Sequence, residues 1–430
     1  PTLTSSGEVI AYKEGLAQEG ALVILHPTGD EIITRTGTMY DYKFAYNDAT
    51  LVWSEYKSHT RWTHGGKMVL ASYDMRHKKY RRYPTQENRY APFAVGSNWG
   101  FVEVGKEDNA SLVIVDNTFE KEIFRVKGTG DELFVHPSYD GQNNIITIVV
   151  SSKGKQIEAI DIHTGKRTPL TAFTPYEIDN PIVVNSQIIY RGAFDANNSL
   201  YRQTTPQQFG HNALTSKFGL RYPIASPDKD SILFSFYTSD GYKPGKIAFS
   251  KLDNKPIENK TFWIADSMTR QENWQFELTS DSTYASRKYN KTSHLFNFHS
   301  WGPIFPDADD VDVDFGLAAS SQNKLSTLFL TAGYVRGKGY KHGNWQVKAT
   351  YKGLWPILQL EFKSGRDDDF TNDYAIRISG TQQIDTVRTT YKFQRTKGIA
   401  TVQFPFNISR KNYSEYPPLR EIRNTSLDRI

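Results

Sequence analysis

The sequence predicts an all-β protein in which a six-bladed β-propeller is followed by an incomplete, transmembrane-type antiparallel β-barrel. First, aromatic residues make up 13% of the 430 residues although hydrophobic residues reach only 38%, a balance that suits pleated sheets. Second, residues 1–250 carry a weak repeat of about 45 residues, the period of propeller blades. Third, residues 311–409 alternate apolar and polar side chains in segments of about ten residues, the length of a tilted strand that crosses a bilayer.

The propeller is predicted over residues 1–255. Its repeat is clearest at 223–230, where a turn containing Ser-Pro-Asp precedes an apolar strand, and at 136–141, which is followed by another. Looser copies begin near residues 7, 49, 99 and 186. Six equivalent strands can therefore be aligned, and six blades lie within the usual range for propellers.

Residues 256–305 are predicted to form a linker between the two regions. The linker ends in a dense group of aromatic residues at 293–303, which we interpret as the seam that joins propeller and barrel. We expect Trp301 and Phe305 to lie near a membrane interface, where amphipathic rings settle.

The barrel is predicted over residues 306–430. Its candidate strands are 311–321, 325–335, 343–352, 354–364, 374–380, 386–394 and 399–409. A soluble β-sandwich would also have a polar outer face, but no second apolar layer is available to cover these strands. Seven strands do not close a bacterial barrel, which needs an even number of at least about eight. We therefore expect a partial barrel, and a chain that is a mature or internal piece of a longer protein.

Composition excludes several classes of protein. Mean hydropathy is −0.57, and no run of about 18 apolar residues occurs, so a bundle of transmembrane helices is excluded. Without cysteine, neither disulfides nor thiolate metal sites can form. The basic run at 76–83 resembles a patch for nucleic acid or lipid headgroups, but an exposed strand edge protected by Lys and Arg is the simpler interpretation. No nucleic-acid partner is expected.

Motifs that carry chemistry are scarce. Asp310, Asp312 and Asp314 resemble the start of a calcium loop, but Phe315 stands where that loop requires Gly and Ser321 where it requires Glu. They are a weak metal candidate, and three acids on the wet face of a strand are the favoured interpretation. The ten histidines lack zinc spacing, and no Gly-x-Ser-x-Gly elbow or phosphate loop occurs. We predict no catalytic residue, no cofactor and no cofactor-binding residue, although a triad assembled from distant positions stays open.

Residues 293–303, 320–327 and 351–357 resemble a family of Bacteroidota outer-membrane proteins. Its members join a TolB-like or tricorn-like propeller to a C-terminal barrel, and the propeller segments at 7–12 and 51–55 are similar too. The resemblance implies the outer membrane of a Gram-negative bacterium, with the propeller in the periplasm or at the cell surface. Some relatives carry a metallopeptidase His-Glu-x-x-His motif upstream, and that motif does not occur in this sequence.

Two functions follow as expectations. In the first, the propeller is an outer-membrane-anchored module that binds a protein or ligand in an envelope complex for secretion, assembly or nutrient uptake, without catalysis of its own. Its partners would be outer-membrane lipid and other envelope proteins. In the alternative, the chain is the propeller and barrel portion of a membrane-anchored hydrolase whose catalytic domain lies upstream of residue 1. A soluble two-domain binding protein is a third possibility.

Overall fold

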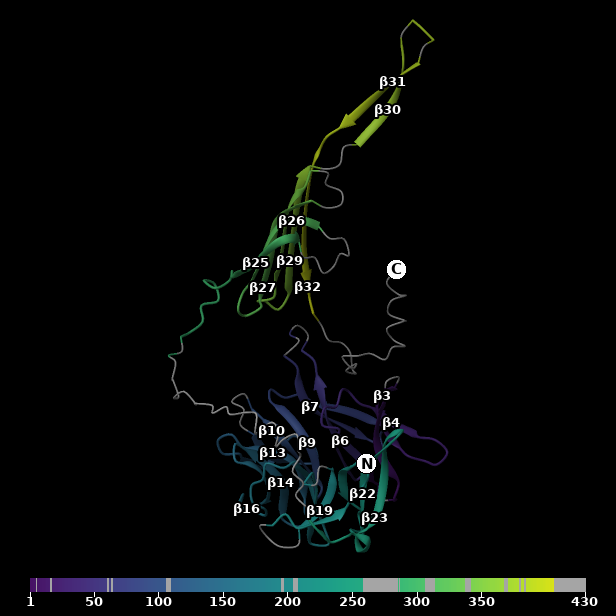
Figure 1. Cartoon of the computed structure of the whole chain (residues 1–430), viewed down its shortest axis with the longest axis vertical. Coiled ribbons are helices and arrows are strands. Elements are labelled where there is room, and N and C mark those ends of the chain that lie inside the picture. The colour runs from purple at the N-terminus through teal and green to yellow at the C-terminus, as the bar shows by residue number, and fades with distance from the viewer. Residues whose placement is uncertain are drawn as a thin grey trace, which may run out of the picture. The chain divides into compact units, whose positions relative to one another are not determined.

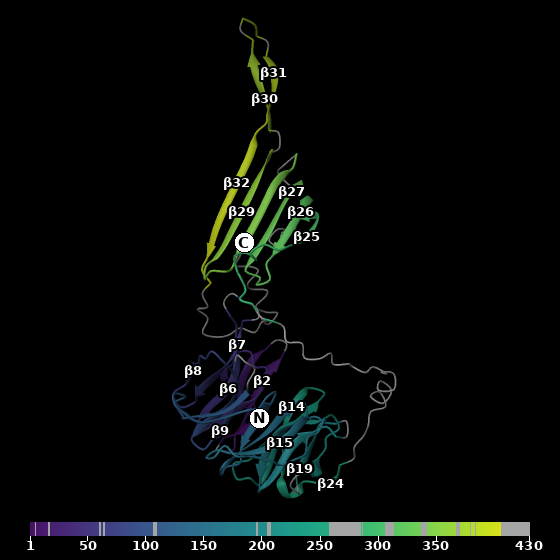
Figure 2. The same ribbon diagram turned by 90° about the vertical axis from the view of Figure 1, so that its left-hand side faces the viewer.

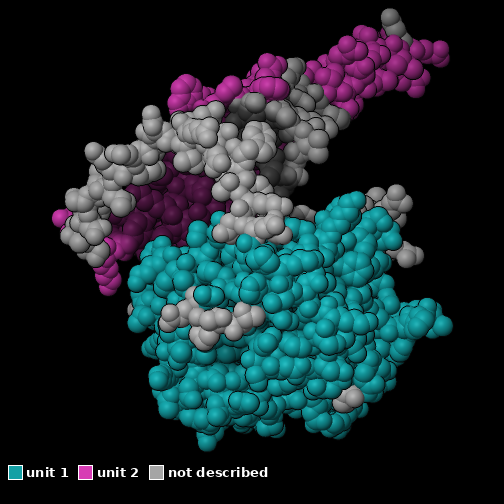
Figure 3. Space-filling view, turned by 60° about the horizontal axis from the view of Figure 1, so that its bottom comes forward, with its two compact units in different colours: residues 1–275, 409–430 teal, residues 276–408 magenta. Residues whose placement is uncertain are grey.

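The computed structural model describes most of the chain. The described residues are 1–4, 6–15, 18–59, 62, 65–105, 110–194, 197–203, 208–257, 285, 287–305, 314–336, 342–366, 370–378, 380–382 and 384–405. They form two compact units, Pro1–Gln275 with Ser409–Ile430, and Phe276–Ile408 (Figure 3). Strands dominate both units, and a single turn of 3-10 helix, η1 (Phe249–Lys251), is the helix seen in the described part. No helix there is long and apolar enough to span a bilayer.

The described part of the first unit contains six antiparallel sheets, which we number blades 1 to 6 in chain order (Figure 1). Blade 1 consists of β1 (Thr2–Leu3), β2 (Val9–Gly15), β3 (Gln18–Ile24) and β4 (Glu31–Arg35). Blade 2 consists of β5 (Phe44–Asn47), β6 (Thr50–Lys57), β7 (Lys67–Asp74) and β8 (Lys79–Tyr83). Blade 3 consists of β9 (Asn88–Val95), β10 (Asn98–Val104), β11 (Ala110–Val115) and β12 (Glu122–Lys127). Blade 4 consists of β13 (Leu133–Tyr139), β14 (Asn144–Ser151), β15 (Gly154–Asp161) and β16 (Arg167–Pro169). Blade 5 consists of β17 (Ile178–Val184), β18 (Gln187–Gly192), β19 (Ser199–Gln203), β20 (His211–Leu214) and β24 (Lys255–Pro256). Blade 6 consists of β21 (Leu220–Ala225), β22 (Ser231–Thr238) and β23 (Gly241–Ala248).

Hydrophobic clusters join each blade to the next. The strands are apolar on both faces, so each sheet can pack against two neighbours, and five buried clusters lie between successive blades from 1 to 6. Within blades 2 and 3, for example, Val52 and Leu70 pack against Phe101. This arrangement of six sheets confirms the predicted all-β class and the propeller.

The junction between blades 6 and 1 differs from the other five. Blade 6 has three strands, because the chain after β23 adds β24 to the outer edge of blade 5. A cavity of about 480 Å³ lies between the two blades, lined by Leu3 and Val9 of blade 1 and by Leu233 and Pro244 of blade 6. In the described part of the chain, no buried hydrophobic cluster joins these two blades.

The second unit is one six-stranded antiparallel sheet with a separate hairpin. In sheet order the strands are β25 (Phe298–Phe305), β26 (Asp314–Gln322), β27 (Leu328–Arg336), β28 (Asn344–Tyr351), β29 (Ile357–Arg366) and β32 (Gln394–Gln403). Among the described residues, the hairpin of β30 (Phe370–Arg377) and β31 (Ile384–Tyr391) pairs only within itself, and it extends past the end of the sheet in both views (Figures 1 and 2).

Strands occur near all seven predicted positions, but the sheet they form differs from the prediction in three ways. The seam at 293–303 overlaps β25, the first strand of the sheet, and is therefore not only a linker. β29 pairs directly with β32, so β30 and β31 do not continue the series. β25 and β32 are the two edges of the sheet in the described residues, so no closed barrel is seen and the predicted barrel is not confirmed. The division at residues 255 and 305 stays a prediction.

The cross-strand register gathers most of the large apolar side chains on one face of the sheet, as their alternation predicts. One row of neighbours across β26 to β29 reads Ala319, Ala332, Val347 and Phe362. The adjacent row, on the opposite face, reads Ser320, Thr331, Lys348 and Glu361. The sheet thus has an apolar face and a polar face.

Candidate binding channel of the propeller

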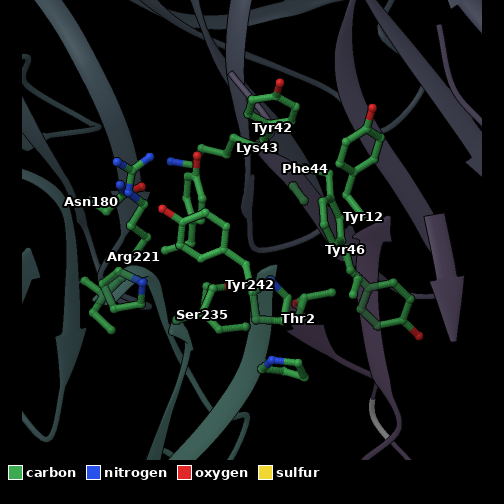
Figure 4. Close-up of a pocket in the computed structure, with 18 of the residues that line it drawn as sticks. Thr2, Tyr12, Tyr42, Lys43, Phe44, Tyr46, Asn180, Arg221, Ser235 and Tyr242 are labelled. Carbon is green, nitrogen blue, oxygen red and sulfur yellow. The ribbon is translucent and has the colours of Figure 1, made fainter. Parts of the chain in front are cut away.

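A cavity of about 780 Å³ lies where the blades meet, and residues from all six blades line it (Figure 4). The first strands of the blades supply most of the lining, which identifies the cavity as the central channel of the propeller. Its volume is in the range of pockets that hold small-molecule ligands. We define the channel by this lining.

Four blades present the same strained backbone to the channel. In β9, β13, β17 and β21 the strand is interrupted by a bulge where a residue with positive φ precedes a proline. These residues are Ala91, His136, Asn180 and Tyr222, with φ of 46°, 48°, 47° and 53°. Side chains other than Gly avoid this region, and a following proline restricts the residue further. Bulges of this kind re-aim the chain, and the four prolines all line the channel.

Polar contacts link different blades across this region, at their first strands or just before them. Lys43 of blade 2 donates from Nζ to the carbonyl oxygen of Pro137 in blade 4 at 2.7 Å. Ser138 of blade 4 donates to the carbonyl oxygen of Pro181 in blade 5 at 2.6 Å. The amide of Ala91 in blade 3 donates to a carboxylate oxygen of Asp41 at 3.0 Å. The bulges therefore supply backbone groups that hold the blades together.

A buried ion pair lies behind the wall of the channel. Arg191 donates from Nε to Oδ1 of Asp179 at 2.7 Å, and a second hydrogen bond joins the same two side chains. Asn180 donates to the same carboxylate at 2.8 Å. Burial opposes the charge of Asp179, but the hydrogen bonds and charge of Arg191 hold the pKa of that carboxyl below its usual range.

Two titratable groups near this pair are shifted in pKa by burial. Burial lowers the pKa of Lys43 to about 8, although the charges of Asp41 and Asp179 act in the opposite direction. Burial, with the nearby charge of Lys43, lowers the pKa of His136 to about 4. The Nδ1 atom of His136 is buried and has no hydrogen-bond partner among the described residues. His136 is thus neutral at neutral pH.

Basic side chains outnumber acidic ones along the channel. The lining includes Lys13, Lys43, Arg221 and Lys243 against Glu14 and Asp240. Lys13 forms an ion pair with Asp30, and Glu14 accepts a hydrogen bond from the Tyr12 hydroxyl at 3.0 Å. Over the described part of the chain, Lys43 and Arg221 make no ion pair with a carboxylate.

Aromatic side chains form much of the remaining wall. They are Tyr12, Tyr42, Phe44, Tyr46, Phe93, Tyr139, Tyr222 and Tyr242. The rings of Tyr12 and Tyr42 lie 5.6 Å apart, and the Arg221 guanidinium lies 5.5 Å from the centre of the Tyr242 ring. The arrangement can bind a flat or apolar body and an anionic group at once.

The residues singled out in the sequence lie elsewhere. Asp310 and Asp312 are outside the described residues, and Asp314 begins β26 in the other unit. No group of three or more His, Asp or Glu side chains that could hold a metal ion occurs in the described part. Sequence reasoning missed the channel, although one signal was present: Pro92, Pro137, Pro181 and Pro223 recur at intervals of 42 to 45 residues.

No protein-family model matches the chain, and no curated protein matches its sequence. Among solved structures, it is similar to an oligogalacturonate lyase in complex with manganese, at 12% identity over 56% of this chain and 75% of that one, with a TM-score of 0.40. It is also similar to a putative TolB from Agrobacterium tumefaciens, at 13% identity over 53% and 83% of the two chains (TM-score 0.38), and to TolB from Acinetobacter baumannii, at 11% over 71% and 77% (TM-score 0.30). These similarities are ones of fold, and membership of an outer-membrane family stays a prediction.

Proposed function

We propose that this chain is an outer-membrane-anchored binding protein. Its C-terminal sheet would meet lipid, and its propeller would bind a protein or ligand of the cell envelope on the periplasmic or outer side. The observation that carries the anchoring is the apolar face of the six-stranded sheet, which is exposed. Trp301 is 80% exposed, Trp345 61% and Leu360 58%.

A sheet that is stable in water buries its apolar face and solvates its polar face. Here the opposite holds, because Asn344 and Gln346 on the polar face are buried while Trp345 between them is exposed. Each large apolar side chain left in water forgoes about 1.5–3 kcal/mol of burial. Lipid contact on one side and a wet interior on the other would explain this polarity.

Aromatic side chains lie near both ends of the apolar face. Tyr334 and Trp345 contact each other at one end, with ring centroids 5.2 Å apart. Trp355 and Phe404 lie at the other end, with centroids 5.6 Å apart. Aliphatic side chains such as Val347 occupy the middle. From Trp345 to Tyr351, β28 rises about 20 Å, which compares with the apolar band of about 25 Å in barrels flanked by aromatic girdles.

The proposal carries one structural requirement. Unpaired backbone groups are too costly in hydrocarbon, so a sheet in lipid must have no free edge. The edges at β25 and β32 must therefore pair with further strands, from the same protein or from another chain. The channel would remain the binding site of the propeller, and no catalytic role is assigned to it.

Reconstitution of the full chain with vesicles tests the anchoring. We expect the chain to float with phosphatidylcholine–phosphatidylglycerol vesicles, and brominated acyl chains to quench Trp345, which faces outward, but not Trp53, which is fully buried in the propeller. Single-tryptophan variants separate the two signals. A chain that stays in the soluble fraction, with no quenching of Trp345, would contradict the proposal.

Matched variants on the two faces of β29 sharpen this test. Leu360→Arg places a charge near the middle of the apolar face and should cost about 2–4 kcal/mol of insertion. Gln359→Arg, one residue away on the polar face, should insert like the unmodified chain. Equal insertion of both variants would rule out lipid contact by this face.

A further inference from the structure

Lys43 and Arg221 are two cations at one side of the channel, and among the described residues neither has a carboxylate within ion-pair distance. Figure 4 shows both side chains directed toward the same part of the cavity, near Asn180. Lys43 makes one hydrogen bond, to the carbonyl oxygen of Pro137, and an ammonium group has three donors. Arg221 has five donors; its guanidinium lies 5.5 Å from the centre of the Tyr242 ring and makes a side-chain hydrogen bond with Tyr222. Both groups therefore keep hydrogen-bonding capacity toward the channel.

Structural support alone does not explain this pair. Burial of Lys43 with no carboxylate within ion-pair distance in the described part of the chain destabilises the protein, and the lowered pKa of Lys43 reflects that cost. Arg221 is exposed, so this cost falls on Lys43. The backbone beside it is strained at His136 and Asn180, and strain of this kind concentrates at ligand sites. An incoming anion would complete the donors of both side chains.

The charged groups around Lys43 and Arg221 determine how many negative charges a bound anion can carry. Asp41 and Asp179 act on Lys43 from behind the wall, and Glu14 and Asp240 line the cavity. Lys13 is paired with Asp30 and Asp179 with Arg191. Among the remaining groups, Asp41, Glu14 and Asp240 nearly balance Lys43, Arg221 and Lys243, so a group with one negative charge fits better than a phosphate dianion. The planar fork of Arg221 matches a carboxylate in two-point contact.

The aromatic wall defines the rest of the ligand. Tyr12 and Tyr46 lie on the side of the cavity away from Lys43 and Arg221 (Figure 4). Tyrosine rings offer flat apolar surfaces with a hydroxyl at the edge, which suits an aromatic body that carries a polar substituent. A cavity of about 780 Å³ has room for a ligand of this kind.

We propose that the channel binds a small aromatic carboxylate, with the carboxylate held between Lys43 and Arg221 and the ring against the tyrosines. This inference rests on the propeller being the binding module of the proposed function, and it is independent of the membrane anchoring.

Calorimetric titration of the full chain with 4-hydroxyphenylacetate tests the proposal, with the matched neutral 4-hydroxyphenylacetamide and inorganic phosphate as comparison ligands. We expect the carboxylate to bind with a dissociation constant below about 1 mM, and the amide and phosphate to bind at least tenfold more weakly. Equal binding of the amide, tighter binding of phosphate, or no binding of the carboxylate at 10 mM would each overturn the proposal.

Variants assign the binding to the two cations. Arg221→Gln and Lys43→Met should each weaken carboxylate binding at least tenfold while leaving amide binding unchanged. Lys166→Gln, at an exposed turn outside the channel, serves as the matched control and should bind normally. Because Lys43 also links blades 2 and 4, Arg221→Gln is decisive if Lys43→Met does not fold, and normal carboxylate binding by Arg221→Gln would overturn the assignment. Vesicle flotation tests the membrane anchoring independently of ligand binding, so the two proposals can fail separately.

Discussion

The propeller and the C-terminal sheet use the same side chains in opposite ways. In the propeller, Trp53 and Trp99 lie in the clusters between blades and are almost completely buried. In the sheet, Trp301 and Trp345 lie on the apolar face and are mostly exposed. Both regions are antiparallel and aromatic-rich, so strand geometry alone does not determine burial. What differs is the number of layers: each blade packs against neighbours, and in the described residues the sheet has no second layer.

Buried polar residues also differ between the propeller and the sheet. The propeller buries Glu55 completely, yet it surrounds the carboxylate with donors. The sheet buries Asn344 and Gln346 on its polar face and leaves its apolar face uncovered. The propeller thus follows the rules of a protein folded in water. The sheet follows those rules only if something other than water covers its apolar face, which is the basis of the proposed anchoring.

The largest effect is expected from breaking the buried network of the propeller at Glu55. Its carboxylate accepts hydrogen bonds from the indole of Trp53 at 2.8 Å, the amide of Gly37 at 2.9 Å and the hydroxyl of Tyr80 at 2.5 Å, and it pairs with Arg82. Glu55→Ala leaves the Arg82 charge half-buried and unpaired, and should lower the free energy of unfolding by about 4 kcal/mol. Urea denaturation followed by tryptophan fluorescence measures the change.

The matched control is Glu361→Ala on the polar face of the sheet, at a partly exposed position. Ion pairs of exposed groups contribute little, so the expected change is below about 1 kcal/mol. A loss at Glu361 as large as the loss at Glu55 would show that the polar face of the sheet is packed as tightly as a propeller core.

A smaller contrast is expected between two leucines. Leu112 is fully buried between blades 3 and 4, whereas Leu360 lies on the exposed face of β29. Leu112→Ala removes buried methyl groups and leaves a cavity, which should cost about 3 kcal/mol of stability. Leu360→Ala should change the stability in aqueous solution by less than about 0.5 kcal/mol. A large loss for Leu360→Ala in water, without lipid or detergent, would mean that protein covers the apolar face.

The sequence predicts much of the sheet because a period of two fixes which side chains share a face. It predicts less well where a strand contains signals that usually break one. Gly302 and Pro303 lie within β25. Pro303 falls at a register shift against β26, between Gly302 and Ile304, which is a position where a strand tolerates proline. The separation of β30 and β31 from the sheet depends on the long-range pairing of β29 with β32, for which the alternation carries no signal.

The channel could not be predicted because its residues come from six blades that are distant in the sequence. The recurring prolines, such as Pro92 and Pro137, mark equivalent positions, but a residue before proline normally takes an extended conformation. The positive φ at Ala91 and His136 is therefore a product of tertiary packing. The position of Lys43 beside Pro137 likewise depends on two blades meeting across the ring.

The smallest expected effect is a loss of stability at acidic pH that comes from His136 of the propeller. The native propeller holds His136 neutral down to its pKa of about 4, whereas the unfolded chain protonates this side chain near pH 6.5. Between these values the unfolded state binds the extra proton, so the contribution of His136 to the free energy of unfolding falls as the pH drops from 6.5 to 4 and is constant below pH 4. Allowing for the partial exposure of His136, the loss should be about 2 kcal/mol.

His136→Asn isolates this contribution, because Asn tolerates a φ of 48° and does not titrate. Urea unfolding at pH 7 and pH 4.5 should show a smaller acid-induced loss in this variant than in the unmodified protein. His299→Asn, at an exposed position in the second unit, should leave the loss unchanged. An identical acid-induced loss in the unmodified protein and in His136→Asn would mean that His136 titrates normally in the native state, and that burial at the bulge imposes no cost on its charge.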